Sequence, residues 1–171
     1  MSDPLTNHFG FRAAQGWLEL GCPADAAVEL AQLPPELKRH PDVLRIQFHV
    51  ERMLKRFPEA LAVADSLIAV APDDKWGWLY RSHALHWLGR SIEAYDLLEP
   101  LRTTFPDAFE LPYDLACYCA QTERVDEARH WLSEAFRLGK KSAAAIEGMA
   151  LDDQDLKPLW EDIRKRKLGN G

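Results

Sequence analysis

Four short stretches of the sequence decide the fold: ADAAVEL at 24–30, PEALAVA at 58–64, IEAYDLL at 92–98 and DEARHWL at 126–132. Each has an alanine at its third position, and successive alanines are 34 residues apart. These alanines are Ala26, Ala60, Ala94 and Ala128. A fixed period of this length is the sequence signature of a repeat protein, so we take 34 residues as the structural unit.

The prolines follow the same period, because Pro72 and Pro106 are 34 residues apart and each precedes an aspartate. The period divides the chain into units at 7–40, 41–74, 75–108 and 109–142. Within a unit the apolar residues recur at helical spacing, and glycines such as Gly21 and Gly89 separate its two halves. We therefore expect helices near 8–20, 24–32, 42–55, 59–70, 75–88, 91–104, 110–121 and 125–138.

This pattern resembles the tetratricopeptide repeat (TPR). Its opening tryptophan is matched by Trp78, and its closing proline by Pro72 and Pro106. Ala14, Ser82 and Ala116 match its small residue, and the alanine column matches the alanine of its second helix. The resemblance implies an all-α protein, an α-solenoid of four antiparallel helix pairs in one domain, 1–171. A helical bundle without repeats is the alternative, but it leaves the constant spacing unexplained.

The segment 143–171 follows the last unit and is expected to cap it. We expect a helix from Ser142 to Met149, with Ser142 as its N-cap. The stretch LDDQDLKPLW at 151–160 is similar to the end of many bacterial TPR arrays, and Leu156, Leu159 and Trp160 should bury against the last repeat. A docking peptide is the alternative. The basic run at 164–167 is interpreted as a solvated tail rather than a phosphate contact.

The net charge of −6 argues against a nucleic-acid-binding protein, which usually needs a basic face. Residues 1–9 contain no basic region followed by an apolar run, so no signal peptide is expected. No stretch reaches the roughly 18 apolar residues of a membrane-spanning helix. We therefore predict a cytoplasmic protein without a membrane or nucleic-acid partner.

The sequence contains no phosphate-binding glycine loop, no HExxH and no GxSxG motif. The nearest candidate for a metal site is a column of His49, His83 and Cys117, spaced by 34, with His86 beside it. Helices pack about 8–10 Å apart, however, whereas zinc–ligand bonds are about 2.0–2.3 Å, so a closed four-ligand site would be strained. We therefore predict no metal, no cofactor and no enzymatic activity.

The family resemblance implies that the first helix of each pair lines a concave groove. Trp76, Tyr80, His83 and Trp87 form one stripe along such a helix, flanked by Arg45 and Arg52 on the preceding first helix. The stripe is either an exposed binding patch or packs between neighbouring first helices. The predicted groove residues are Trp76, Tyr80, His83, Trp87, Arg45, His49, Arg52 and Tyr113. Other groove positions include Phe11, Arg12, Gln15, Asp42 and Ile46.

These features favour a non-enzymatic scaffold that binds a protein or peptide segment with an apolar or aromatic anchor and acidic flanks. Two alternatives stay open on the sequence: an RNA-contacting helical-repeat protein, and a self-assembling module without another ligand. The partner, the pathway and the oligomeric state are not encoded in any motif that we recognise.

Overall fold

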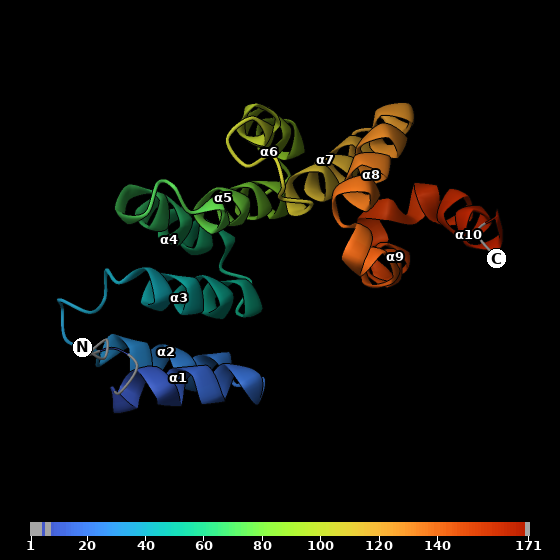
Figure 1. Ribbon diagram of the computed structural model, residues 1–171. Coiled ribbons are helices and arrows are strands. Elements are labelled where there is room, and N and C mark those ends of the chain that lie inside the picture. Colours follow the sequence, from blue (N-terminus) through green and yellow to red (C-terminus); the bar gives the residue numbers. More distant parts are fainter. Residues whose placement is uncertain (1–4, 6–7, 170–171) are drawn as a thin grey trace. The chain divides into compact units, whose positions relative to one another are not determined.

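The structure is a computed structural model that describes residue 5 and residues 8–169, apart from the side chains of 141 and 166–169. Every regular element in these ranges is helical, as Figure 1 shows. The chain divides into two compact units, Met1–Leu88 and Gly89–Gly171. The predicted all-α repeat fold is therefore present, and each unit has its own packing.

The first unit contains two complete helix pairs and the first helix of a third. Each helix packs against the next along the chain, and α1 also contacts α3. This is the arrangement expected when each repeat contributes a helical hairpin that cannot bury its apolar face alone. The helices are α1 (Phe9–Glu19), α2 (Pro23–Ala31), α3 (Pro41–Met53), α4 (Phe57–Val70) and α5 (Lys75–Trp87).

The second unit contains the rest of the third repeat, the fourth repeat and the closing segment. Its most extensive packing is between α7 and α8, the two helices of the fourth repeat. The elements are α6 (Ser91–Leu98), the 3₁₀ turn η1 (Glu99–Arg102), α7 (Glu110–Gln121), α8 (Val125–Leu138), η2 (Lys140–Ser142), α9 (Ala143–Asp152), η3 (Gln154–Leu159) and α10 (Trp160–Gly169).

Local sequence signals set the helix ends. Pro23 and Pro41 each occupy the first turn of a helix, where the missing N–H has no partner to lose. Gly21 and Gly89 have φ of +74° and +77°, the left-handed conformation that glycine adopts without strain. One boundary was predicted wrongly: α6 ends at Leu98 instead of near 104, because Pro100 cannot continue an α-helix and the chain turns into η1.

The repeated alanines lie at the centre of the helix pairs. All four have 0% exposed surface, which fits their expected place at the crossing of two closely packed helices. Around them, leucines such as Leu30, Leu67, Leu98 and Leu132 complete the buried face of each second helix. A larger side chain in place of any of these alanines would force the paired helices apart.

The closing segment folds back onto the fourth repeat. Leu156 and Leu159 of η3 are buried, and η3 contacts α7, α8 and α9. Trp160 is half-buried, and its indole Nε1 donates to the carbonyl oxygens of Ala150 (3.0 Å) and Asp153 (3.2 Å). The segment thus covers the end of the array, as a capping segment must.

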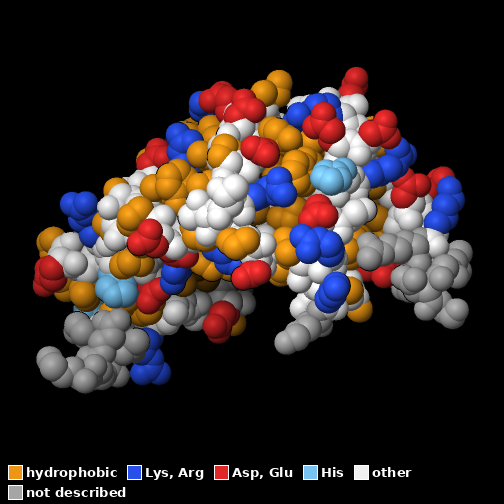
Figure 2. Space-filling model, turned by 45° about the horizontal axis from the view of Figure 1, so that its top comes forward, with side chains coloured by type: hydrophobic (Ala, Val, Ile, Leu, Met, Phe, Trp, Pro, Cys, Tyr) orange, Lys and Arg blue, Asp and Glu red, His pale blue; other side chains and the backbone are white. Residues whose placement is uncertain are grey.

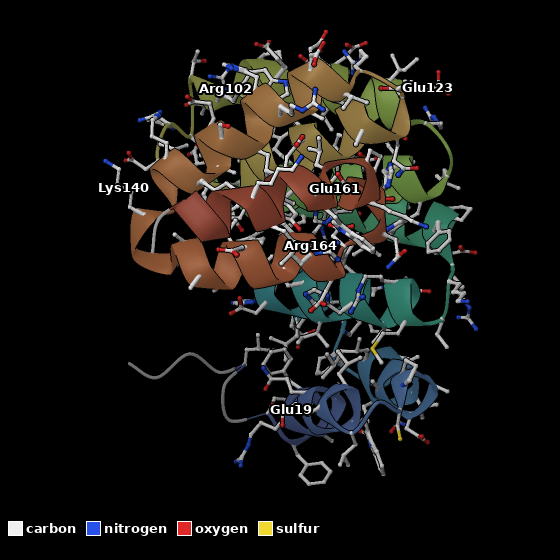
Figure 3. All side chains as sticks on the ribbon, turned by 90° about the vertical axis from the view of Figure 1, so that its right-hand side faces the viewer. Glu19, Arg102, Glu123, Lys140, Glu161 and Arg164 are labelled. Atoms are coloured by element: carbon white, nitrogen blue, oxygen red, sulfur yellow. The ribbon has the colours of Figure 1, made fainter. Side chains whose placement is uncertain are left out.

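Two details of the closing segment differ from the prediction. The helix extends to Asp152 rather than to Met149, and the side chain of Ser142 makes no capping hydrogen bond at its start. Figure 3 shows Glu161 and Arg164 on α10, where the Arg164 guanidinium lies 5.8 Å from the ring of Trp160. None of the described helices is long and apolar enough to cross a membrane.

Candidate partner-binding surface

Seven of the eight predicted groove residues lie on α3 and α5 of the first unit, and these two helices bring several of them together. His49 Nε2 and the hydroxyl of Tyr80 are 3.1 Å apart, and their rings meet edge to face. Trp76 and Tyr80 have ring centroids 5.9 Å apart, and His83 and Trp87 have centroids 5.8 Å apart. The predicted stripe therefore exists as a row of rings along α5.

The middle of the stripe is part of the hydrophobic core. Tyr80 is only 7% exposed, and its ring stacks on Phe48 with centroids 4.1 Å apart and an interplanar angle of 4°. Trp87 is half-buried between Phe48 and Phe57, at centroid distances of 5.9 and 5.4 Å. Both rings pack against Phe48, so Tyr80 and Trp87 belong to the packed interior beneath the surface.

Trp76 is the exposed end of the stripe. Its side chain is 36% exposed, and the Lys75 ammonium lies 5.1 Å from its ring centroid, a cation–π distance. Its backbone N–H donates to the carboxylate of Asp74, the N-cap of α5. An aromatic ring held at a fixed helix start is well suited to contact a partner, because little side-chain freedom is lost on binding.

Arg45 is held in place by two carboxylates. Its Nη1 donates to Asp42 Oδ1 at 2.6 Å, and its Nη2 donates to Asp74 Oδ2. Since Asp74 also caps α5, Arg45 ties the second repeat to the start of the third. The positive charge of Arg45 is therefore neutralised by two carboxylates of the same unit. Arg45 holds α3 against the start of α5 and does not present a free charge to a partner.

Arg52 and Arg12 differ from Arg45. Both side chains are exposed, and neither forms a salt bridge or hydrogen bond with any residue in the described part of the chain. His49 contributes no positive charge at neutral pH, because burial and the nearby Arg52 and His83 lower its pKa below the usual value. Among the described groove positions of the first unit, the arginines available to a partner are therefore Arg12 and Arg52.

The first unit also has an open hollow of about 460 Å³ between α1 and α3. Its walls include the apolar side chains of Phe11 and Ile46, together with the polar ends of other side chains. All of its lining residues occupy groove positions of the repeat: Phe11, Arg12, Gln15, Asp42, Arg45 and Ile46. The family resemblance predicts that these are groove positions, whereas their convergence into one hollow depends on helix packing that the sequence does not display.

Tyr113, the eighth predicted residue, lies in the second unit under the closing segment. Its hydroxyl donates to Asp153 Oδ2 at 3.0 Å, and Cys117 Sγ donates to the same oxygen at 3.6 Å. Gln121 Nε2 donates to the carbonyl of Asp155. The closing segment thus already contacts three groove positions of the fourth repeat. Burial raises the pKa of both Tyr113 and Cys117.

The described surface carries charged side chains of both signs. On the face drawn in Figure 2, acidic and basic side chains are interspersed, with apolar surface between them. Among the described residues, no group of three or more histidine, cysteine, aspartate or glutamate side chains could hold a metal ion. The described surface of the first unit carries an exposed aromatic ring, an apolar hollow and exposed arginines.

The paired helices, the 34-residue period and the buried alanine column together define an all-α repeat fold of the TPR type. Solved structures agree with this fold. The chain is similar to a crystal structure of MamA (15% identity, 83% of each chain covered, TM-score 0.69). It is also similar to TTC0263, a thermophilic TPR protein in Thermus thermophilus (19% identity, 94% of this chain and 96% of that chain covered, TM-score 0.68).

A third similar structure is MamA 41-end from Desulfovibrio magneticus RS-1, with 19% identity, 96% of this chain and 94% of that chain covered, and a TM-score of 0.68. No family model matches the chain, and no curated protein matches it. At these identities the similarity establishes the fold alone.

Proposed function

We propose that the protein is a non-enzymatic scaffold that holds a segment of a partner protein on the first-helix face of its first unit. The observation that carries this proposal is the open hollow of about 460 Å³ between α1 and α3, lined by side chains at the groove positions of the repeat. Its volume is within the usual range of binding pockets, roughly 300–1,000 Å³.

The lining of the hollow indicates the chemistry of the partner. Phe11 and Ile46 offer an apolar wall, so an apolar side chain of the partner fits there. Arg12 at the hollow and Arg52 further along α3 are exposed cations without a carboxylate partner in the described chain. A segment with an apolar anchor and acidic residues on its flanks would satisfy both features, with Trp76 as a second apolar contact.

Tyr80, Trp87 and Tyr113 have indirect roles in this proposal. Tyr80 packs against Trp76, and Trp87 packs against Phe48 and Phe57, while Tyr113 is covered by the closing segment. The proposed contact residues are therefore Phe11, Arg12, Ile46, Arg52 and Trp76, a smaller set than the sequence suggests.

A phage-displayed random peptide library selected on the purified protein tests this proposal. Enriched peptides should combine a large apolar residue with aspartate or glutamate. Their affinity, measured by fluorescence anisotropy, should fall at least about tenfold in Ile46→Ala or Arg52→Glu, the latter with reduced salt dependence. The control Arg39→Glu makes the same charge change at another exposed arginine of the unit and should bind as the parent does.

Selection that yields no apolar–acidic peptides would contradict the proposal. So would peptides whose affinity is unchanged in Ile46→Ala and Arg52→Glu while both variants keep the parent's circular dichroism and melting curve.

A further inference from the structure

Helix α1 has apolar side chains on two opposite faces. Phe11, Ala14 and Leu18 pack into the core of the first unit. On the other side, Phe9 is 82% exposed and Leu20 is 72% exposed. Trp17, also exposed, lies on this outer face as well, because 9, 13, 17 and 20 are separated by three or four residues. A surface helix buries one apolar face in its own core, so a second, exposed apolar face indicates contact with another molecule.

Gly16 lies in the middle of this outer face. A glycine inside a helix costs about 1 kcal/mol relative to alanine, and it is usually found where backbone geometry or a close contact requires it. Here a Cβ atom would meet nothing within 4 Å, and the φ of Gly16 is not in the left-handed region. Nothing in the described chain therefore explains the glycine, whereas a second helix crossing at Gly16 and Ala13 would.

The outer face is symmetric along the helix. Phe9 and Leu20 lie at equal distances on either side of the point between Ala14 and Gln15, about 8 Å each at 1.5 Å per residue. Ala13 and Gly16 lie at equal distances closer to the same point. In an antiparallel pair of two α1 helices centred there, each Phe9 faces Leu20 of the second copy, and the small residues meet at the crossing.

The charges at the border of this face are complementary in the same arrangement. Arg12 and Glu19 are seven residues apart and so lie along one edge of α1, and neither forms a salt bridge in the described chain. In the antiparallel pair, Arg12 of one copy lies along the axis within about 3 Å of Glu19 of the second copy, on the same edge. The two ion pairs would form by symmetry.

We infer that the outer face of α1, made of Phe9, Ala13, Gly16, Trp17 and Leu20, binds the same face of a second copy of the chain in an antiparallel, two-fold symmetric dimer. The contact is isologous, because the same patch is used on both copies. A single helix pair buries less than the roughly 800 Å² per partner of a standard interface, so the dimer is weak, with a dissociation constant on the order of 10 µM or higher.

The apolar contacts of this inference come from the outer face of α1 and not from the hollow, so it goes beyond the proposed function, and Arg12 is the one residue that the two surfaces share. Sedimentation velocity over about 1–500 µM protein tests it, and the weight-average mass should rise from one chain to two. Gly16→Leu and Leu20→Glu should remain monomeric throughout. Leu20→Glu should melt like the parent, and Gly16→Leu should melt no lower than the parent, because a helix interior favours leucine over glycine. Gly16→Leu is the sharper variant, because a Cβ atom added at Gly16 meets nothing within 4 Å in the monomer.

Two controls fix the location and the direction of the contact. Ile92→Glu, at a side chain that is 63% exposed in the second unit, should dimerise like the parent. Arg12→Glu and Glu19→Arg should each weaken the dimer about tenfold, and the double exchange should restore it to within about threefold.

A parent chain that stays monomeric over the whole range would overturn the inference. A Gly16→Leu variant that dimerises like the parent, or an Ile92→Glu variant that fails to dimerise, would also overturn it. If the single charge variants weaken the dimer and the double exchange does not restore it, the antiparallel arrangement is wrong.

Discussion

Two aromatic residues one helical turn apart on α5 have different roles in the molecule. Trp76 is the exposed end of the stripe, while Tyr80 stacks on Phe48 in the core and lies within hydrogen-bond distance of His49. Sequence periodicity places both on one helix face but cannot say which of them another helix covers. That depends on Phe48, which precedes Tyr80 by 32 residues and belongs to the previous repeat.

Replacing these two residues should separate binding from folding. Tyr80→Ala removes a buried ring and should lower the free energy of unfolding by about 3–5 kcal/mol, as for other large-to-small core changes. Trp76→Ala should lower it by clearly less than Tyr80→Ala does, because 36% of the Trp76 surface is already exposed, against 7% for Tyr80. Urea unfolding followed by circular dichroism measures both, and equal losses in the two variants would show that Trp76 is also core.

Glu51 is a carboxylate in an unfavourable place. It lines a hollow of about 250 Å³ between α2 and α3, together with apolar residues such as Val43 and Val50. Its side chain is 12% exposed, and its nearest cation, Arg56, is 3.8 Å away. Burial raises the pKa of Glu51 above the usual value, and the partial compensation by Arg56 does not reverse this.

The raised pKa predicts how stability depends on pH. The folded state holds the Glu51 proton more tightly than the unfolded chain, so this residue lowers stability as pH rises above the unfolded value of about 4.3. Glu51→Gln should therefore be more stable than the parent at pH 7, with a difference that shrinks towards pH 4. Urea midpoints between pH 4 and 8 measure this difference, and the exposed Glu36→Gln serves as the control. A difference that does not change with pH would refute the assignment.

At the scale of elements, the sequence predicts the helices well and their contacts less well. The 34-residue period and the glycines and prolines between segments define all eight repeat helices, because these signals are local. The early end of α6 at Pro100 and the longer α9 are the exceptions. The hollow between α1 and α3 and the covering of Tyr113 by the closing segment are not local, since they join residues far apart in the chain.

Asp153 joins the closing segment to the fourth repeat. Its Oδ1 accepts the backbone N–H of Asp155 at the start of η3, while its Oδ2 accepts from Tyr113 and Cys117. Asp153→Ala leaves the buried Tyr113 hydroxyl without this acceptor and should lower the free energy of unfolding of the second unit by about 1–3 kcal/mol. The neighbouring Asp152 is exposed, so Asp152→Ala should be neutral. Thermal unfolding of both variants tests this, and equal melting temperatures would show that Asp153 does not hold the cap.

At the scale of the whole molecule, the groove positions of the repeat have different surroundings in the two units. In the first unit these positions line an open hollow, whereas in the second unit Tyr113, Cys117 and Gln121 bond to the closing segment. This surface is thus exposed in the first unit and covered by the closing segment in the second unit. The exposed surface of the first unit is the one proposed to bind a partner segment.

Hydrogen–deuterium exchange of the protein, with and without a peptide selected from the library, tests this claim most directly. We expect slower exchange over α1, α3 and the start of α5 when the peptide is bound, and unchanged exchange over η3 and α10. Protection confined to the second unit, or no protection in α1 and α3 at saturating peptide, would contradict it.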